Sequence, residues 1–173
     1  MTPAEIRSLI RDIPDFPKPG IIFRDITPLI ANARGLAAVV DQLAEPFLGQ
    51  VDIVLGIESR GFIIGAPVAY RLGVGLAIAR KPGKLPSRFV EEAYELEYGR
   101  AELQMHQDGI GTNARVLVVD DLLATGGTAE AAVRLVRRVG GEIVGCAFVV
   151  ELTGLKGRER LAPLKVTSLI QYD

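Results

Sequence analysis

Residues 116–128, with the sequence VLVVDDLLATGGT, indicate the fold of this chain more strongly than any other stretch. The run at 116–119 is rich in β-branched residues and too apolar for a half-exposed strand, so it predicts a strand buried in a parallel sheet. Two carboxylates and a short Gly-rich loop follow, and a helix is expected from about Thr128 to Val139. With a further strand at 143–150, this order predicts a βαβ unit.

The segments on the N-terminal side continue the alternation of strands and helices. Helices are expected over 34–47 and 61–72, and strands over 51–57 and 74–79. This alternation predicts an α/β fold with a mainly parallel, twisted sheet flanked by helices. Residues 81–114 fit neither period, and are expected to form a hairpin or a mobile flap.

The N-terminus is expected to begin with a short amphipathic helix. Thr2 and Glu5 have the spacing of a capping box, and a proline occupies the first helical position between them. Apolar residues at positions 6, 9, 10 and 13 supply one face, so the helix is expected to reach Ile13. Pro14 would then end it.

The composition excludes several classes of function. The 173 residues contain 20 Lys and Arg against 21 Asp and Glu, and a net charge of −1 gives no electrostatic basis for broad nucleic-acid binding. A single cysteine, Cys146, excludes a disulfide framework and a Cys-rich zinc site. The longest uncharged stretch, 61–70, is about half of a membrane span, and the N-terminus has no signal-peptide core. We therefore expect a soluble, cytoplasmic, single-domain protein without nucleic-acid or membrane partners.

The loop that follows the 116–119 strand has the composition of a phosphate-binding site. In an open parallel sheet, ligands bind at the carboxyl ends of the strands, where this loop must lie. Gly126 and Gly127 allow backbone N–H groups to approach an anion, while Thr125 and Thr128 offer hydroxyl groups. The N-terminus of the following helix adds the positive end of its dipole. The loop therefore favours a bound phosphate.

Asp120 and Asp121 would repel a phosphate unless they contact another part of the ligand. Sugar hydroxyls, which donate hydrogen bonds to carboxylates, are one answer, and a Mg²⁺-bound water is the other. The combination favours a 5′-phosphorylated ribose. A nucleoside triphosphatase would need the motif G-x-x-x-x-G-K-[ST] upstream. The Gly83-Lys84 pair is followed by Leu85, so that alternative fails.

The stretch at 116–128 resembles the phosphoribosyl-pyrophosphate (PRPP) signature of the type I phosphoribosyltransferases. Five further segments, in order along the chain, are similar to those of the adenine-specific branch of this family. They are PDFPKPGIIFRDITPL (14–29), GIESRGFIIGAPVA (56–69), RKPGKLP (80–86), YELEYGRAEL (94–103) and ELTGLKGRERLAP (151–163). The resemblance covers nearly the whole chain.

The resemblance implies the type I phosphoribosyltransferase fold, with a small base-binding hood at about 1–33 and a flexible flap at about 81–106. It implies transfer of the 5-phosphoribosyl group from PRPP to adenine, giving AMP and pyrophosphate with inversion at C1′. The transition state is expected to resemble an oxocarbenium ion, which the closed flap would protect from water. Mg²⁺ is expected to be held by PRPP and water, without a complete set of protein ligands. A homodimer is also expected.

The same resemblance assigns residues to three subsites. The ribose and 5′-phosphate of PRPP are assigned to Asp120, Asp121, Ala124, Thr125, Gly126, Gly127 and Thr128. Pyrophosphate is assigned to Ser59, Arg60, Arg80, Lys81 and Lys84, where an unusual backbone geometry is expected near Gly61. Adenine is assigned to Ile22, Phe23, Arg24 and Leu122.

Within these subsites, Phe23 is expected to stack on the adenine ring, and Leu122 to contact its other face. The backbone at Ile22 and Arg24 would bind the amino edge. Two flap residues complete the expected site: Glu97 as the acid/base for the attacking ring nitrogen, and Tyr98 to order the closed flap.

Two other functions compete with this interpretation. A phosphoribosyltransferase for a 6-oxopurine or a pyrimidine is disfavoured by the segment at 14–29. A non-enzymatic purine sensor is disfavoured because the helix before Pro14 is too short for a DNA-binding domain and the Glu97-Tyr98 motif indicates turnover. Outside the site, Arg134 and Arg138 are expected on the exposed side of the 128–139 helix, without a ligand.

Overall fold

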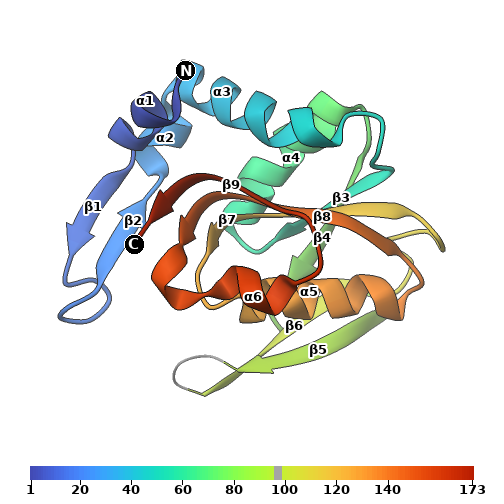
Figure 1. Ribbon diagram of the computed structural model, residues 1–173. Coiled ribbons are helices and arrows are strands. Elements are labelled where there is room, and N and C mark those ends of the chain that lie inside the picture. Colours follow the sequence, from blue (N-terminus) through green and yellow to red (C-terminus); the bar gives the residue numbers. More distant parts are fainter. Residues whose placement is uncertain (96–98) are drawn as a thin grey trace.

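The computed structural model describes residues 1–95 and 99–173. In this part of the chain, β7 (Arg115–Leu123) is an inner strand of a seven-stranded sheet with the order β5-β6-β4-β3-β7-β8-β9. The five strands from β4 to β9 in this order run parallel to one another, while β6 and β5 are antiparallel at one edge (Figure 1). The other strands are β3 (Ile53–Ile57), β4 (Gly75–Arg80), β5 (Phe89–Glu95), β6 (Arg100–His106), β8 (Glu142–Leu152) and β9 (Val166–Tyr172).

Helices cover both faces of the sheet, as Figure 1 shows. On one face lie α3 (Ala33–Ala44), which the 3₁₀ turn η1 (Glu45–Phe47) follows, and α4 (Arg60–Leu72); α5 (Gly127–Arg138) covers the other. Alternate residues of β7 enter the two cores: Leu117 and Val119 pack on the α3–α4 side, and Val116 and Val118 on the α5 side. The prediction of a strand buried on both faces, within a mainly parallel α/β sheet, is confirmed.

Strand β7 is longer than its apolar run suggests. The sequence predicts that β7 ends before the two carboxylates, but the strand continues through them to Leu123. The pairing of β7 with β3 stops at Val119, while its pairing with the longer β8 extends to Leu123 and Glu151. Asp120 and Asp121 therefore occupy a strand segment that has lost its neighbour on one side, next to the start of α4.

The N-terminal region is only partly helical. α1 (Pro3–Ser8) has the expected capping box at Thr2 and Glu5, but the prediction of a helix as far as Ile13 is wrong. Residues Arg11–Pro14 form β1, which pairs antiparallel with β2 (Ile22–Asp25), and an ion pair of 2.6 Å joins Arg11 to Asp25. Pairing with a segment distant in sequence outweighs the helical spacing of the apolar residues. The short helix α2 (Thr27–Ala31) follows.

The two outer parts of the chain complete the sheet. Residues 81–114 contain the β5–β6 hairpin, in agreement with one of the two expected forms. After β8, η2 (Thr153–Leu155) and α6 (Gly157–Leu161) lead to β9, which the sequence did not predict. Among the described residues, no helix is both long enough and apolar enough to cross a membrane.

Candidate active site

The loop between β7 and α5 encloses a small hollow at the carboxyl end of the sheet. Its volume is about 70 Å³, and its lining includes Asp120, Leu122 and all residues from Leu123 to Ala129. Gly126 precedes α5 and supplies no side-chain cap for it. The first N–H groups of a helix have no partner within the helix, so this end of α5 presents unpaired donors and a positive dipole end to the hollow. The predicted phosphate-loop residues are thus brought together around one anion-sized space.

The loop is held by close backbone packing. Gly126 has φ of +83°, and a Cβ at this position would lie 2.6 Å from the carbonyl oxygen of Gly157. Gly157 begins α6, within the segment 151–163 whose role the sequence left open. A side chain at either glycine would push α6 and the loop apart, so α6 forms the back wall of the phosphate loop.

The two carboxylates differ in their surroundings. Asp121 is buried and its side chain lies 2.5 Å from the Nε of Arg60. Asp120 is half-buried, and one of its oxygens accepts a hydrogen bond of 2.8 Å from the backbone N–H of Asp121. Burial, and secondly the charge of Asp121, raise the pKa of Asp120 well above its ordinary value. Among the described residues, the ion pair of Arg60 is with Asp121, and its charge only partly offsets the rise in the pKa of Asp120.

Arg60 connects the carboxylates to the predicted base site. Its guanidinium carbon lies 5.1 Å from the centre of the Phe23 ring, in addition to its ion pair with Asp121. Phe23 makes an edge-to-face contact with Phe16 at 5.3 Å, and Ile22 beside it is half exposed. The structure thus brings the N-terminal hairpin β1–β2 next to the carboxyl end of β7, where Leu122 is also partly buried.

The side chain of Arg24 points to a different part of the molecule. Its guanidinium group pairs with Asp12 at 2.5 Å and lies 3.9 Å from the centre of the Tyr172 ring on β9. These contacts engage the charged end of the side chain. The predicted contact with adenine involves only the backbone of Arg24, which belongs to β2, so the position of the side chain does not contradict it.

The predicted pyrophosphate residues cluster where β3 and β4 end. Ser59 is exposed at the start of α4, and the unusual backbone geometry expected there is a cis peptide bond between Glu58 and Ser59. Glu58, which the sequence analysis did not select, accepts hydrogen bonds from Arg80 (3.3 Å) and from the backbone N–H of Lys81 (2.9 Å). Burial acts to raise the pKa of Glu58, but these hydrogen bonds and nearby cations lower it. Glu58 could have been selected from the sequence because it directly follows a predicted buried strand.

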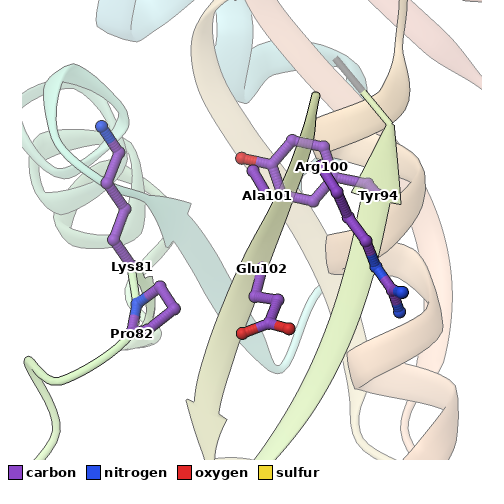
Figure 2. A pocket seen from close by; sticks show the side chains of 6 residues that line it. All are labelled: Lys81, Pro82, Tyr94, Arg100, Ala101 and Glu102. Atoms are coloured by element: carbon purple, nitrogen blue, oxygen red, sulfur yellow. The ribbon is translucent and has the colours of Figure 1, made fainter. Parts of the chain in front are cut away.

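A larger cavity of about 570 Å³ lies beside these cations. In Figure 2, Lys81 and Pro82 line one side, while residues of the β5–β6 hairpin, including Arg100 and Glu102, line the other. Tyr94 also lines the cavity and, like Arg100, was not predicted as a site residue. Lys84 is exposed nearby, and its carbonyl accepts a hydrogen bond of 3.3 Å from Arg80. Glu97 and Tyr98, to which the sequence analysis assigns roles, lie outside the described residues.

The fold agrees with comparison to known proteins. A family model, the phosphoribosyl transferase domain, matches residues 23–171. The fold and site therefore define a phosphoribosyltransferase. Adenine phosphoribosyltransferase from Chloroflexus aurantiacus is 56% identical over 173 residues, covering 99% of this chain and 100% of its own.

Solved structures show the same likeness. Adenine phosphoribosyltransferase from Thermoanaerobacter pseudethanolicus superimposes with a TM-score of 0.96 at 47% identity, covering 99% of this chain and all of its own. The enzyme from Saccharomyces cerevisiae, solved with D-2,5-dideoxy-2,5-imino-altritol 1,6-bisphosphate and adenine, has a TM-score of 0.91 at 36% identity, covering 96% and 97% of the two chains. The chain belongs to the adenine phosphoribosyltransferase family.

Proposed function

We propose that this protein transfers the 5-phosphoribosyl group of PRPP to adenine, producing AMP and pyrophosphate. One observation carries the proposal: Arg60 contacts both Asp121, next to the phosphate loop, and Phe23 in the N-terminal hairpin. A sugar phosphate in the loop would therefore have its anomeric carbon close to a flat apolar surface that suits a purine ring.

The phosphate loop and the carboxylates would bind the two ends of phosphoribose. The 5′-phosphate is assigned to the α5 N-terminus and to Thr125 and Thr128, in the hollow that the loop encloses. The ribose hydroxyls are assigned to Asp120 and Asp121. A hydroxyl that donates to Asp120 stabilises its charged form, which burial disfavours in the free protein. Ligand binding would thus offset the unfavourable free energy of the charged Asp120 carboxylate in the free protein.

The base would bind against the β1–β2 hairpin. Phe23 stacks on adenine, the backbone of Ile22 and Arg24 meets the amino edge, and Leu122 contacts the other face. A base with donors and acceptors exchanged at this edge would leave buried polar groups unpaired, which is the basis for discrimination against guanine and hypoxanthine.

The leaving pyrophosphate would be held by Ser59 and the cations Arg60, Arg80, Lys81 and Lys84. Their positive charges offset the negative charge that develops as the C1′–O bond breaks, and the ribose gains oxocarbenium character. Attack of the adenine nitrogen from the opposite face gives inversion at C1′. The proposed hood at 1–33 and flap at 81–106 would exclude water from this step.

Glu97 and Tyr98 keep the roles that the family resemblance assigns to them: the acid/base for adenine and the ordering of the closed flap. Glu97→Gln should lower kcat far more than it changes the KM for adenine, because the carboxylate acts on the reacting nitrogen. Steady-state kinetics tests this role, and a variant with unchanged turnover would remove it.

Mg²⁺ would enter the site with PRPP. In residues 1–95 and 99–173, no group of three or more His, Cys, Asp or Glu side chains is arranged to hold a metal ion. Asp120, whose carboxylate has no ion pair of its own among the described residues, has the oxygen chemistry to accept hydrogen bonds from metal-bound water. When bound, the ion would neutralise pyrophosphate oxygens. The part of the protein itself would be to orient the ribose, through Asp120 and Asp121.

Homodimer formation is a further part of the proposal. The outer side of α4 presents Ile63, Pro67 and Tyr70 at helical spacing, and Tyr70 is 88% exposed, which is unusual for so large a side chain. A second copy of the chain would cover this face. Tyr70→Lys should shift the molecular mass in analytical ultracentrifugation towards that of a monomer. The cytoplasmic location predicted from sequence stays a prediction.

The proposed activity can be tested by pyrophosphate release from PRPP and Mg²⁺ with adenine, hypoxanthine, guanine or uracil in parallel. Release with adenine alone is expected. Release with another base would keep the PRPP site and contradict the proposed base site. A folded protein that binds PRPP without release with any base would instead be a purine or PRPP sensor.

A further inference from the structure

An ion pair between a buried carboxylate and a partly exposed arginine connects α6 to the two strands beneath it. Glu151, near the end of β8, is 4% exposed. Arg158 of α6 meets it with two hydrogen bonds, from Nε at 3.0 Å and from Nη2 at 2.5 Å. Two parallel bonds of this kind fix the direction of the guanidinium group as well as its distance.

Further bonds make this pair part of a closed network with β9. Arg158 also donates to the carbonyl oxygen of Val166 at 2.7 Å, and the Ser168 hydroxyl donates to Glu151 at 2.5 Å. Gln171 donates to the same carboxylate at 3.4 Å. The carboxylate thus has partners on β9 and on α6, and the guanidinium group has partners on β8 and β9. The first turn of α6 is consequently fixed with respect to both strands.

The position of α6 matters because its first residue touches the phosphate loop. A Cβ at Gly157 would lie 2.9 Å from the backbone nitrogen of Gly126, and would also collide with the carbonyl oxygen of Ala124. Arg158 is the next residue along the chain. A shift of Arg158 therefore moves Gly157, and with it the support of the loop that lines the hollow.

A role in stability alone is a weak explanation for this pair. Burial of the Glu151 carboxylate costs hydration free energy, and its attraction to Arg158, whose side chain is 43% exposed, returns only part of it. Hydrogen bonds with fixed directions provide something that apolar packing does not, which is precise placement of a backbone segment. Here that segment lies against the loop proposed to bind PRPP.

We propose that Glu151 and Arg158 are positioning residues for the phosphate loop: their ion pair holds α6 so that Gly157 supports Gly126 and Ala124 in the conformation that binds the 5′-phosphate. The effect on PRPP rests on the proposed function. The mechanical part, support of the loop by α6, is a property of the free protein and can be measured separately.

The experiment compares Glu151→Gln and Arg158→Gln with a control, Arg115→Gln. Arg115 forms an equally well-formed ion pair with Asp52, at 2.7 Å, but on the opposite end of β7. Hydrogen exchange of the 122–130 region in the free protein reports loop support. The KM values for PRPP and for adenine report the consequence for binding.

In both Glu151→Gln and Arg158→Gln, the amide hydrogens of the 122–130 region should exchange faster than in the wild-type protein. The KM for PRPP should rise about tenfold or more. The KM for adenine should stay within about twofold of the wild-type value, since the stacking ring and the edge contacts proposed for adenine lie on β2, away from α6. The control should change neither quantity. Ser168→Ala, which removes a single bond to Glu151, should give the same pattern with a smaller amplitude, and it serves if either charge variant fails to fold.

Unchanged exchange in the loop would overturn the proposal, as would an equal rise of both KM values, which is the signature of general destabilisation. A wild-type protein without activity would contradict the proposed function instead. The exchange measurement would then still decide whether α6 supports the loop.

Discussion

The phosphate loop and the β5–β6 hairpin border the same end of the sheet, but they are held in place by different means. The loop is fixed by backbone contacts, with Gly126 against Gly157 and the N-terminus of α4 against the end of β7, where a Cβ on Gly61 would lie 2.9 Å from the carbonyl oxygen of Val119. The hairpin is held on α5 by long side chains. Arg134 bonds to Glu92 at 3.2 Å and to the carbonyl of Ala93 at 2.8 Å.

Arg138 adds hydrogen bonds from the next turn of α5, to the Glu91 carbonyl at 2.9 Å and to Glu92 at 3.3 Å. Arg138 is exposed, as expected, whereas Arg134 is half-buried, and both bond to the hairpin. Exposed ion pairs contribute little to stability and rearrange easily, whereas backbone contacts without space for a Cβ do not. The two regions therefore suit a rigid site and a covering element that can open.

The largest effect is expected where the loop's backbone contact is broken. Gly126→Ala places a methyl group 2.6 Å from the Gly157 carbonyl oxygen and should lower kcat/KM for PRPP by about 100-fold. Gly73→Ala is the matched control, because Gly73 also has a positive φ, +72°, but nothing lies within 4 Å of its Cβ. The control should lose roughly 1–2 kcal/mol of stability without loss of activity. Equal activity of the two variants would contradict the rigid-loop interpretation.

The next effect concerns the half-buried carboxyl group of Asp120 beside the loop. Asp120→Asn removes the acceptor proposed for a ribose hydroxyl and should weaken PRPP binding, measured by calorimetry, about 10-fold or more. The same change should raise the thermal stability of the free protein at pH 7. Unchanged affinity for PRPP would remove Asp120 from the ribose site.

The sign of this stability change follows from the raised pKa of Asp120 in the folded protein. The folded state binds the proton more tightly than the unfolded state, so the wild-type stability falls as pH rises from about 3.8 through the folded pKa. Asn carries no charge and avoids this loss. The advantage of the variant should therefore disappear in acid, and an advantage that is independent of pH would point to another cause.

A smaller effect is expected for the bonds that hold the hairpin. Arg134→Gln combined with Arg138→Gln should accelerate hydrogen exchange in β5, while the global free energy of unfolding changes by about 1 kcal/mol or less for each pair. High salt should shift the wild-type protein towards the variant, because it screens exposed charges. If the whole protein instead unfolds cooperatively with the hairpin, the distinction between the two regions fails.

The smallest effect is expected at the opposite end of β7. The charge and hydrogen bonds of Arg115 lower the pKa of Asp52 to about 2, so the pair favours the folded state at neutral pH and this contribution is lost as pH falls towards 2. Both side chains are exposed, so Asp52→Asn should reduce the melting temperature slightly at pH 7 and leave kcat/KM unchanged. A large loss of activity would show that the loop also depends on distant charges.

Several local features were accessible from the sequence because their physical causes are local. The run at 116–119 was apolar on both faces and lies between two cores, and the glycines at 126 and 127 mark the turn into α5. Cys146 lies within the apolar strand expected at 143–150 and is buried, and burial raises the pKa of its thiol to about 12. The residues of the phosphate loop could be selected together because they are contiguous.

Other features depended on contacts between distant segments. The spacing of apolar residues at 6, 9, 10 and 13 suited a helix, but pairing with β2 converts Arg11–Pro14 into a strand. No local sequence pattern distinguishes Glu58 and Glu151 from other acidic residues. In the structure they form ion pairs with Arg80 and Arg158. Neither partner has a sequence spacing that identifies it.

The sequence by itself determined the parallel α/β architecture, the phosphate loop and the family, since hydrophobic pattern, turn glycines and contiguous motifs act over short distances. Only the tertiary structure decided that Arg60 joins Phe23 to Asp121, that α6 supports the loop, and that α5 holds the hairpin. The physical reason is that side-chain pairing across strands and helices depends on packing geometry, which no local pattern encodes.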